Sequence, residues 1–184
     1  TEKTIQMVTD QNERLSKMVK TLLDMSELQT VARDEKIEVD ALVEEVLADL
    51  DPLAEEKNVL LESVCDAVTM MGSDILVYRV VYNLVENAIK YNNPGGKVQV
   101  TVCSDKEQIC IQVMDNGSGI PADMKERVFE PFFRVDKSRS RALGGVGLGL
   151  ALVREIVRVH DGAIRVLDNS NGGTTFEILF PETV

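Results

Sequence analysis

Several residue types are scarce in this chain of 184 residues. It contains no Trp, one His and three Cys, and the cysteines have neither a CxxC spacing nor a histidine cluster nearby. These absences argue against the usual zinc and redox sites, so we expect reduced cysteines that pack as small hydrophobic residues. The sequence has no run of about 18 apolar residues and begins without the order of a signal peptide, so we expect a soluble segment.

Positive charge is also in short supply, because 31 acidic residues outnumber 20 Lys and Arg and give a net charge of −11. A surface this acidic repels polyanions, which argues against a general nucleic-acid-binding protein or a protein that binds anionic membranes. Any polyanion that the chain binds must therefore occupy a local basic pocket. The length suits one domain with a sizeable core and one added element.

The sequence pattern divides the chain into parts. Residues 1–30 contain neither Gly nor Pro and carry apolar residues at helical spacing, which predicts one long helix that needs partners to bury its apolar face. Residues 31–36 are typical of a polar linker. Over residues 37–184, strands and helices alternate without a strict βαβ repeat. This predicts an α+β fold: a two-layer α/β sandwich with a mixed, mostly antiparallel sheet and helices on one face.

Local signals predict several boundaries within the larger part. Asp40 is expected to cap a helix that Pro52 kinks or breaks. Ser73 or Asp74 is expected to cap a second helix, which ends at the Gly-rich turn NNPGG. Two segments of alternating apolar and polar residues, joined by SDKE, predict a β-hairpin.

The segment YNLVENAIKYN combines amide and apolar side chains. Residues four or seven apart on a helix share a face, so Asn83, Asn87 and Lys90 are predicted to form one polar stripe. The opposite arc is apolar and wide enough to pack on a sheet. Glu86 lies beside the stripe, and helix geometry favours a surface ion pair for it. Taken alone, the segment is also explained by an ordinary amphipathic helix.

Two glycine-containing segments follow. DNGSGIP begins with Asp115 directly after a predicted strand, and its two glycines allow a close approach of the backbone to a ligand, although a tight turn also explains the first three residues. Further on, Arg134, Lys137, Arg139 and Arg141 precede a helix start that is rich in glycine. Free N–H groups at a helix start favour an anion, so this region predicts a phosphate site. It matches neither the Walker motif nor the Rossmann motif.

Four segments in this order, NLVENAIKY, DNGSGIP, FEPFFRVD and GGVGLGLALV, resemble the N, first glycine, F and second glycine boxes of sensor histidine kinases. The ATP-binding domain of these kinases belongs to a superfamily shared with DNA gyrase, MutL and the large heat-shock chaperone. The resemblance covers residues 37–184, and residues 1–30 resemble the second helix of the kinase dimerisation domain. It implies the Bergerat ATP-binding fold.

The resemblance also implies roles for individual residues. Asn83 and Asn87 would bind Mg²⁺ and the triphosphate, Asp115 would accept the exocyclic amine of adenine, and Thr174 or Thr175 would support that aspartate. Asn83, Lys90 and Arg134 would act in catalysis. The full ATP-binding set implied by the boxes is Asn83, Asn87, Lys90, Tyr91, Asp115, Gly117, Gly119, Ile120, Arg134, Arg139, Gly145, Gly147, Leu148, Gly149, Thr174 and Thr175.

Two features separate this chain from other members of the superfamily. The ATP-hydrolysing members carry a glutamate where this chain has Asn83, and an amide cannot act as a general base, so hydrolysis should be slow. The phosphoacceptor histidine of the kinases is missing, and we expect the single histidine, His160, to be structural. The chain is therefore expected to bind MgATP without phosphorylating itself.

The resemblance implies partners as well. These are a second copy of the chain, paired through the N-terminal helices with the phosphoacceptor domain, and the receiver domain of a response regulator. It implies the cytoplasmic portion of a bacterial sensor kinase that is anchored in a membrane through segments outside this sequence. Three other functions remain open: an ATPase of the gyrase or chaperone type, a serine kinase acting on an anti-sigma partner, and a nucleotide-gated scaffold without catalysis.

Overall fold

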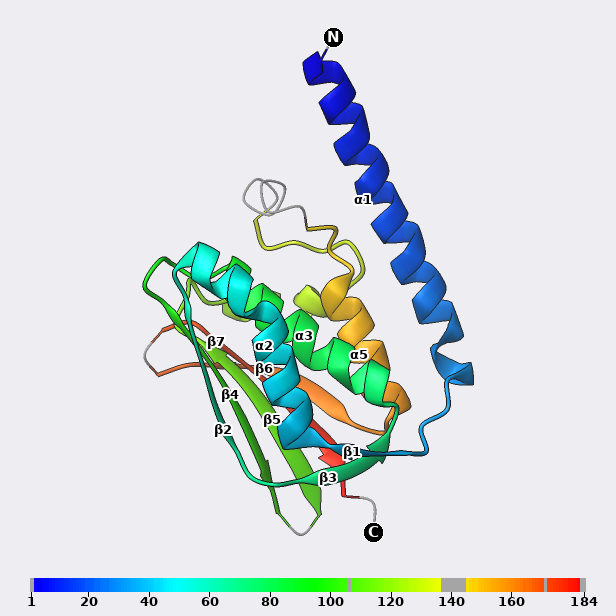
Figure 1. Cartoon of the computed structure of the whole chain (residues 1–184), viewed down its shortest axis with the longest axis vertical. Coiled ribbons are helices and arrows are strands. Elements are labelled where there is room, and N and C mark those ends of the chain that lie inside the picture. The colour runs from blue at the N-terminus through cyan, green and yellow to red at the C-terminus, as the bar shows by residue number, and fades with distance from the viewer. Residues whose placement is uncertain (1, 106, 137–144, 171, 183–184) are drawn as a thin grey trace.

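The computed structural model describes residues 2–105, 107–136, 145–170 and 172–182. The chain begins with one long helix, α1 (Glu2–Glu27), and a short 3₁₀ turn, η1 (Leu28–Thr30). The rest forms a sheet layer covered on one face by helices, from which α1 projects (Figure 1). Among the described residues, no helix is long and apolar enough to cross a membrane.

The main sheet has five strands in the order β2-β4-β5-β7-β6. Only β2 and β4 pair in parallel, and the other neighbours are antiparallel, so the predicted mixed, mostly antiparallel sheet is confirmed. The predicted hairpin is formed by β4 and β5, and its inward residues alternate with outward ones. The strands are β2 (Leu60–Cys65), β4 (Lys97–Ser104), β5 (Gln108–Asp115), β6 (Ala163–Asp168) and β7 (Thr174–Pro181).

Within the described ranges, three helices cover one face of this sheet: α2 (Val39–Lys57), α3 (Asp74–Lys90) and α5 (Gly149–Val159). Each turns an apolar stripe towards the sheet, as the 3.6-residue period requires. Fully buried side chains such as Val77, Leu84 and Ile156 meet Ile111 and Ile178 of the strands in one continuous core. This helix layer over a sheet is the predicted two-layer α/β sandwich. Two 3₁₀ turns, η2 (Ala122–Met124) and η3 (Arg127–Phe129), lie between β5 and α5.

A second, two-stranded sheet pairs β1 (Glu35–Glu38) with β3 (Thr69–Gly72). β1 begins inside the segment expected to be a linker, because the β3 pairing extends it to Glu35. The strand runs directly into α2, whose N-cap is Glu38, so the prediction that Asp40 caps this helix is wrong. The N–H of Val39 instead donates to the carbonyl of Val68 at 2.9 Å, and Asp40 lies in the first turn.

Two further local expectations need correction. Of the kink or break expected at Pro52, the break is wrong, since α2 continues to Lys57. The helix keeps its packed face through the buried residues Leu50 and Ala54. The cysteines are free, but they are not all packing residues, since Cys103 is exposed on the hairpin opposite Cys110. Cys103 follows the buried Val102 in β4, so the alternation of the strand directs the Cys103 side chain to the other face of the sheet.

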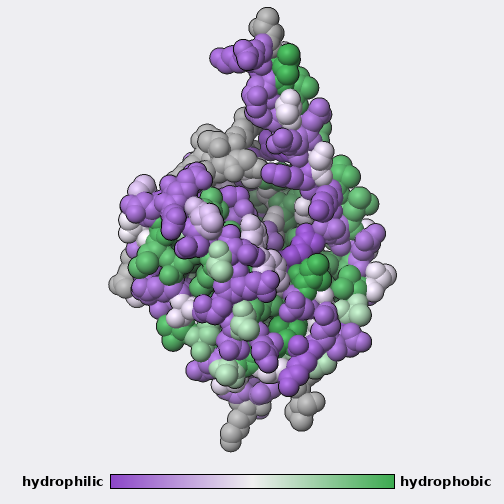
Figure 2. Space-filling view, in the orientation of Figure 1, coloured by the Kyte–Doolittle hydropathy of each residue, from purple (hydrophilic) through white to green (hydrophobic). Residues whose placement is uncertain are grey.

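The long helix α1 differs from the other helices because it has no buried residue. Its apolar side chains are exposed instead: Ile5, Met7, Val8, Leu15, Val19, Leu22 and Leu23. Figure 2 shows these hydrophobic patches along the edge of the projecting helix. The helix meets the rest of the chain near its C-terminal end, where Leu28 of η1 enters the core.

Candidate functional site

One cavity of about 760 Å³ lies between α3, the loop after β5, the segment before α5 and the last turns of α1. This volume is in the range of small-molecule sites. Most of the residues predicted to bind a ligand line it: Asn83, Asn87, Lys90, Tyr91, Asp115, Gly119, Ile120, Arg134, Gly145, Gly147, Leu148, Gly149 and Thr174. Apolar groups such as Val128, Phe133 and Phe176 line it as well.

Asp115 ends β5 and turns its carboxylate into this cavity. Its Oδ1 accepts hydrogen bonds from the N–H of Gly117 at 2.8 Å and from the N–H of Thr174 at 3.3 Å. Burial raises the pKa of Asp115, and the two backbone bonds oppose that rise. Because both bonds end on Oδ1, Oδ2 is the atom that can accept a bond from a bound molecule.

The glycines of DNGSGIP have different roles in the structure. A Cβ on Gly117 would lie 2.9 Å from the carbonyl of Tyr91, so this glycine packs the loop against the end of α3, and it is not among the cavity-lining residues. Gly119 has a φ of +73° and does line the cavity. The two glycines were predicted to let the backbone approach a ligand. At Gly117 the close approach is made to the protein's own backbone instead.

Thr174 and Thr175 open β7, next to Asp115 in the sheet. Thr174 lines the cavity and bonds Asp115 through its backbone N–H. Thr175 is buried and is not among the cavity-lining residues. The geometry therefore favours Thr174 as the neighbour of Asp115. The contact uses the backbone N–H of Thr174, which any residue except proline would provide.

The polar stripe of α3 faces the cavity, and Asn83, Asn87 and Lys90 all line it. The side-chain N–H of Asn83 donates to the carbonyl of Arg79 at 2.7 Å. The side-chain oxygen of Asn83 takes no part in this bond. Glu86 forms an ion pair, as expected for it, and its partner is Lys90 at 2.9 Å. Glu86 is half-buried and lines the cavity, so its description as a surface residue is wrong.

The glycine-rich segment closes the cavity at the start of α5. Arg134 donates through Nη2 to the carbonyl of Gly145. The N–H of Phe132 donates to the carbonyl of Gly147 at 2.7 Å, and a Cβ on Gly147 would lie 2.9 Å from Phe132, so this contact requires glycine. Gly147 also has a φ of +83°. Four residues of the predicted phosphate site, Lys137, Arg139, Arg141 and Gly144, lie outside the described residues.

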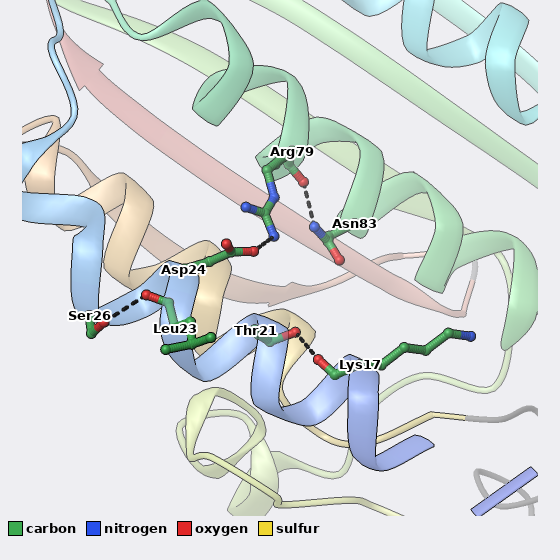
Figure 3. A network of polar contacts seen from close by, with 7 residues as sticks. All are labelled: Lys17, Thr21, Leu23, Asp24, Ser26, Arg79 and Asn83. Carbon is green, nitrogen blue, oxygen red and sulfur yellow. Dashed lines mark hydrogen bonds and ion pairs between the residues drawn. The ribbon is translucent and has the colours of Figure 1, made fainter. Parts of the chain in front are cut away.

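The helix α1 also forms part of this cavity, which the sequence pattern did not predict. Lys17, Lys20, Thr21 and Asp24 line it, and Asp24 forms an ion pair with Arg79 of α3 at 2.8 Å (Figure 3). The apolar spacing of α1 predicted only partners in a bundle. The polar residues of α1 recur at helical spacing on another side, but no local signal connects them to α3.

The family model described as "Histidine kinase-, DNA gyrase B-, and HSP90-like ATPase" matches residues 72–184. The chain therefore belongs to this ATPase family. Within the family it falls with the sensor histidine kinases, as the four boxes predicted. It is 38% identical over 178 residues to the sensor-like histidine kinase SenX3 of Mycolicibacterium smegmatis, an alignment that covers 94% of this chain and 46% of the relative.

Solved structures agree with this assignment. The mycobacterial sensor histidine kinase MprB is 29% identical, with a TM-score of 0.70 over 80% of this chain and 97% of that chain. The histidine kinase ThkA in complex with the response regulator protein TrrA is 26% identical, with a TM-score of 0.78 over 98% of this chain and 51% of that chain. The chain spans about half the length of the curated relatives it matches, for example 46% and 40%.

Proposed function

We propose that this chain is the catalytic part of a sensor histidine kinase, which binds MgATP and transfers the γ-phosphoryl group to a histidine outside this sequence. The observation that carries the proposal is the position of Asp115 in the same cavity as the amide stripe of α3 and the glycine-rich start of α5. One cavity thus joins a purine-reading acceptor to groups that suit a polyphosphate.

The aspartate end of the cavity fits adenine. Oδ2 of Asp115 can accept a bond from the exocyclic amine of adenine, whereas guanine has a carbonyl at that position and would be repelled. Apolar walls that include Ile120 and Phe176 suit the faces of a purine ring. Since Oδ1 is held by two backbone N–H groups, the carboxylate is positioned before the ligand arrives.

The other end fits a triphosphate with a divalent ion. The oxygen ligands available there are the amides of Asn83 and Asn87, a donor type that suits Mg²⁺ retaining several waters. When bound, Mg²⁺ would neutralise phosphate oxygens and favour transfer of the terminal group. Lys90 and Arg134 line the same space as cations that can orient the phosphates.

The side chains near the transferred group favour phosphoryl transfer over rapid hydrolysis, because neither Asn83 nor Glu86 is available as a base. Asn83 cannot activate water as a base, and the nearby carboxylate of Glu86 is held by Lys90. A neutral imidazole is already a nucleophile, so transfer to histidine needs positioning and charge stabilisation alone. Steady ATP turnover at ordinary enzyme rates would instead favour an ATPase of the gyrase or chaperone type.

The partners of the whole protein follow from the same proposal. ThkA is described in complex with a response regulator protein, and a corresponding receiver domain would accept the phosphoryl group from this kinase. The exposed apolar face of α1 fits pairing with a second copy in a helical bundle. Membrane attachment would come from segments that precede this sequence. Because the acceptor histidine is absent here, this chain should retain no label from γ-labelled ATP.

Calorimetric titration with MgATP tests the proposal through Asp115→Asn. The variant keeps an oxygen for the N–H of Gly117 but can place an amide donor against the adenine amine, so we expect about a hundredfold loss of affinity. The matched control is Asp66→Asn, which makes the same change at a residue outside the cavity and should bind like the wild type. Equal affinity of Asp115→Asn and the wild type would overturn the proposal.

A further inference from the structure

The cavity has a wall that belongs to α1, outside the residues matched by the ATPase family model. Lys17, Lys20, Thr21 and Asp24 follow the spacing of three and four residues that places side chains on one face of a helix. At about 100° per residue, this face lies opposite the exposed apolar stripe that includes Leu15 and Leu22. The helix therefore presents two different faces, one apolar and one that lines the cavity.

An ion pair fixes the cavity-lining face of α1 to α3. Asp24 and Arg79 are 2.8 Å apart, and their side chains are 26% and 31% exposed. Figure 3 shows the two side chains pointing towards each other across the space between α1 and α3, with Thr21 and Lys17 on the preceding turns. The carbonyl of Arg79 also accepts a bond from the side chain of Asn83. The Asp24–Arg79 ion pair therefore lies one turn of α3 before the amide stripe.

The cations around the cavity are not equivalent. Arg79 is paired with Asp24, and Lys90 is paired with Glu86. Lys17 and Lys20 line the same cavity, and within the described part of the chain neither has a carboxylate at ion-pair distance. In a chain with a net charge of −11, two unneutralised lysines at one cavity are a local basic site.

We propose that Lys17 and Lys20 of α1 bind the polyphosphate of the nucleotide, with the Asp24–Arg79 pair holding α1 in place. The proposal rests on the function proposed above and extends its ATP site to a second structural unit. Affinity should then depend on the number of phosphates that reach α1. Because coupling is reciprocal, a bound triphosphate should also stabilise the docked position of α1.

The test compares ATP, ADP and AMP in calorimetric titrations of the double variant Lys17→Gln/Lys20→Gln. Both residues are exposed on a helix, so the fold should be retained, as circular dichroism can check. We expect about a tenfold loss for ATP at low salt, a smaller loss for ADP and less than about twofold for AMP, since charge attraction grows with phosphate number. At high salt the losses should shrink.

The matched control is Lys3→Gln/Lys36→Gln, which removes the same charge from exposed positions away from the cavity. It should change ATP affinity by less than about twofold, because exposed charges far apart are screened. Equal losses in the two double variants, or a loss in Lys17→Gln/Lys20→Gln that is the same for all three nucleotides, would overturn the inference.

Hydrogen exchange gives a second readout. We expect ATP to slow exchange of the amides between Lys17 and Asp24 more than AMP does, and equal protection by both would count against the inference. Asp115→Asn separates the two proposals, because it should weaken ATP, ADP and AMP alike. If Asp115→Asn loses binding while Lys17→Gln/Lys20→Gln binds like the wild type, only the role of α1 fails. If Asp115→Asn binds all three nucleotides normally, the proposed function itself fails.

Discussion

The two ends of the helix pair α3 and α5 are built in opposite ways. At one end, a Cβ on Gly149 would lie 3.3 Å from the side-chain oxygen of Asn83, which places the start of α5 beside the polar stripe of α3 at the cavity. At the other end, the N–H of Ser73 donates to Nε2 of His160 at 3.0 Å, which joins the start of α3 to the end of α5.

The far end is closed by this histidine. His160 is buried, its Nδ1 bonds the carbonyl of Ile156 at 2.8 Å, and its ring packs edge-on against Phe180 with centroids 5.9 Å apart. The cavity end has polar groups with unused bonding capacity, such as Oδ2 of Asp115. From this difference we expect changes at the far end to lower stability and side-chain changes at the cavity end to lower nucleotide affinity.

The largest effect should come from Gly173→Ala. This change should reduce both stability and nucleotide affinity, so it does not follow the division between the two ends. A Cβ there would lie 2.0 Å from the carbonyl oxygen of Asp115, so the start of β7 must move. We expect a loss of about 3 kcal/mol in the free energy of unfolding, measured in urea, and a large loss of ATP affinity.

Gly172→Ala is the control for this change. Gly172 also has a positive φ, +82°, but a Cβ there would meet nothing within 4 Å. Only the backbone penalty applies, so we expect a loss of about 1 kcal/mol and unchanged ATP affinity. Similar losses in the two variants would show that backbone conformation, and not the contact with Asp115, decides the effect.

Next in size, His160→Ala should reduce stability and spare binding. It leaves the N–H of Ser73 without its acceptor and removes the ring from Phe180, so we expect a loss of about 2 kcal/mol in urea unfolding. The Kd for MgATP should stay within about twofold of the wild-type value. On the same helix, Arg158→Ala removes an exposed ion pair with Glu155 and should cost less than about 0.5 kcal/mol. A lost ATP affinity in His160→Ala would show that the two ends are coupled.

Asn87→Ala sharpens the comparison from the cavity side. Removing an amide oxygen that suits Mg²⁺ should weaken MgATP binding about tenfold while stability stays within about 0.5 kcal/mol. The titration is done with Mg²⁺ and with EDTA, and the difference between the two conditions should shrink in the variant. Asn12→Ala, at an exposed helical position of α1, serves as the control and should keep the wild-type difference. An unchanged Mg²⁺ effect in Asn87→Ala would remove this residue from the metal site.

The smallest effect should be a pH dependence from His160. Burial lowers the pKa of this histidine in the folded chain, and the nearby Arg33 guanidinium acts in the same direction. As the pH falls, His160 therefore takes up its proton at a higher pH in the unfolded chain than in the folded chain. Its contribution to the free energy of unfolding is complete above a pH of about 6.5 and decreases below that pH. The slope is at most about 1.4 kcal/mol per pH unit. Urea unfolding between pH 5 and 7.5 should show this slope in the wild type and a smaller one in His160→Ala. Equal slopes would assign the effect to other groups.

Much of this architecture was predictable from local sequence. Alternating residues predicted the β4–β5 hairpin, and helical spacing placed Asn83 and Asn87 on one face, because both patterns depend only on the period of the element. Two boundary predictions that failed, the cap at Asp40 and the break at Pro52, were decided by tertiary partners. The β1–β3 pairing satisfies the start of α2, and the buried face of that helix carries it past the proline.

The sequence by itself determined the two-layer fold, the ATPase family and the residues of its four boxes. Only the tertiary structure decided which groups meet, because such contacts join residues far apart in the chain. Thr174 reaches Asp115 across 59 positions, and Asp24 reaches Arg79 across 55. No local period encodes either contact. The placement of α1 against the cavity, with Lys17 and Lys20 at its wall, follows from packing between whole elements.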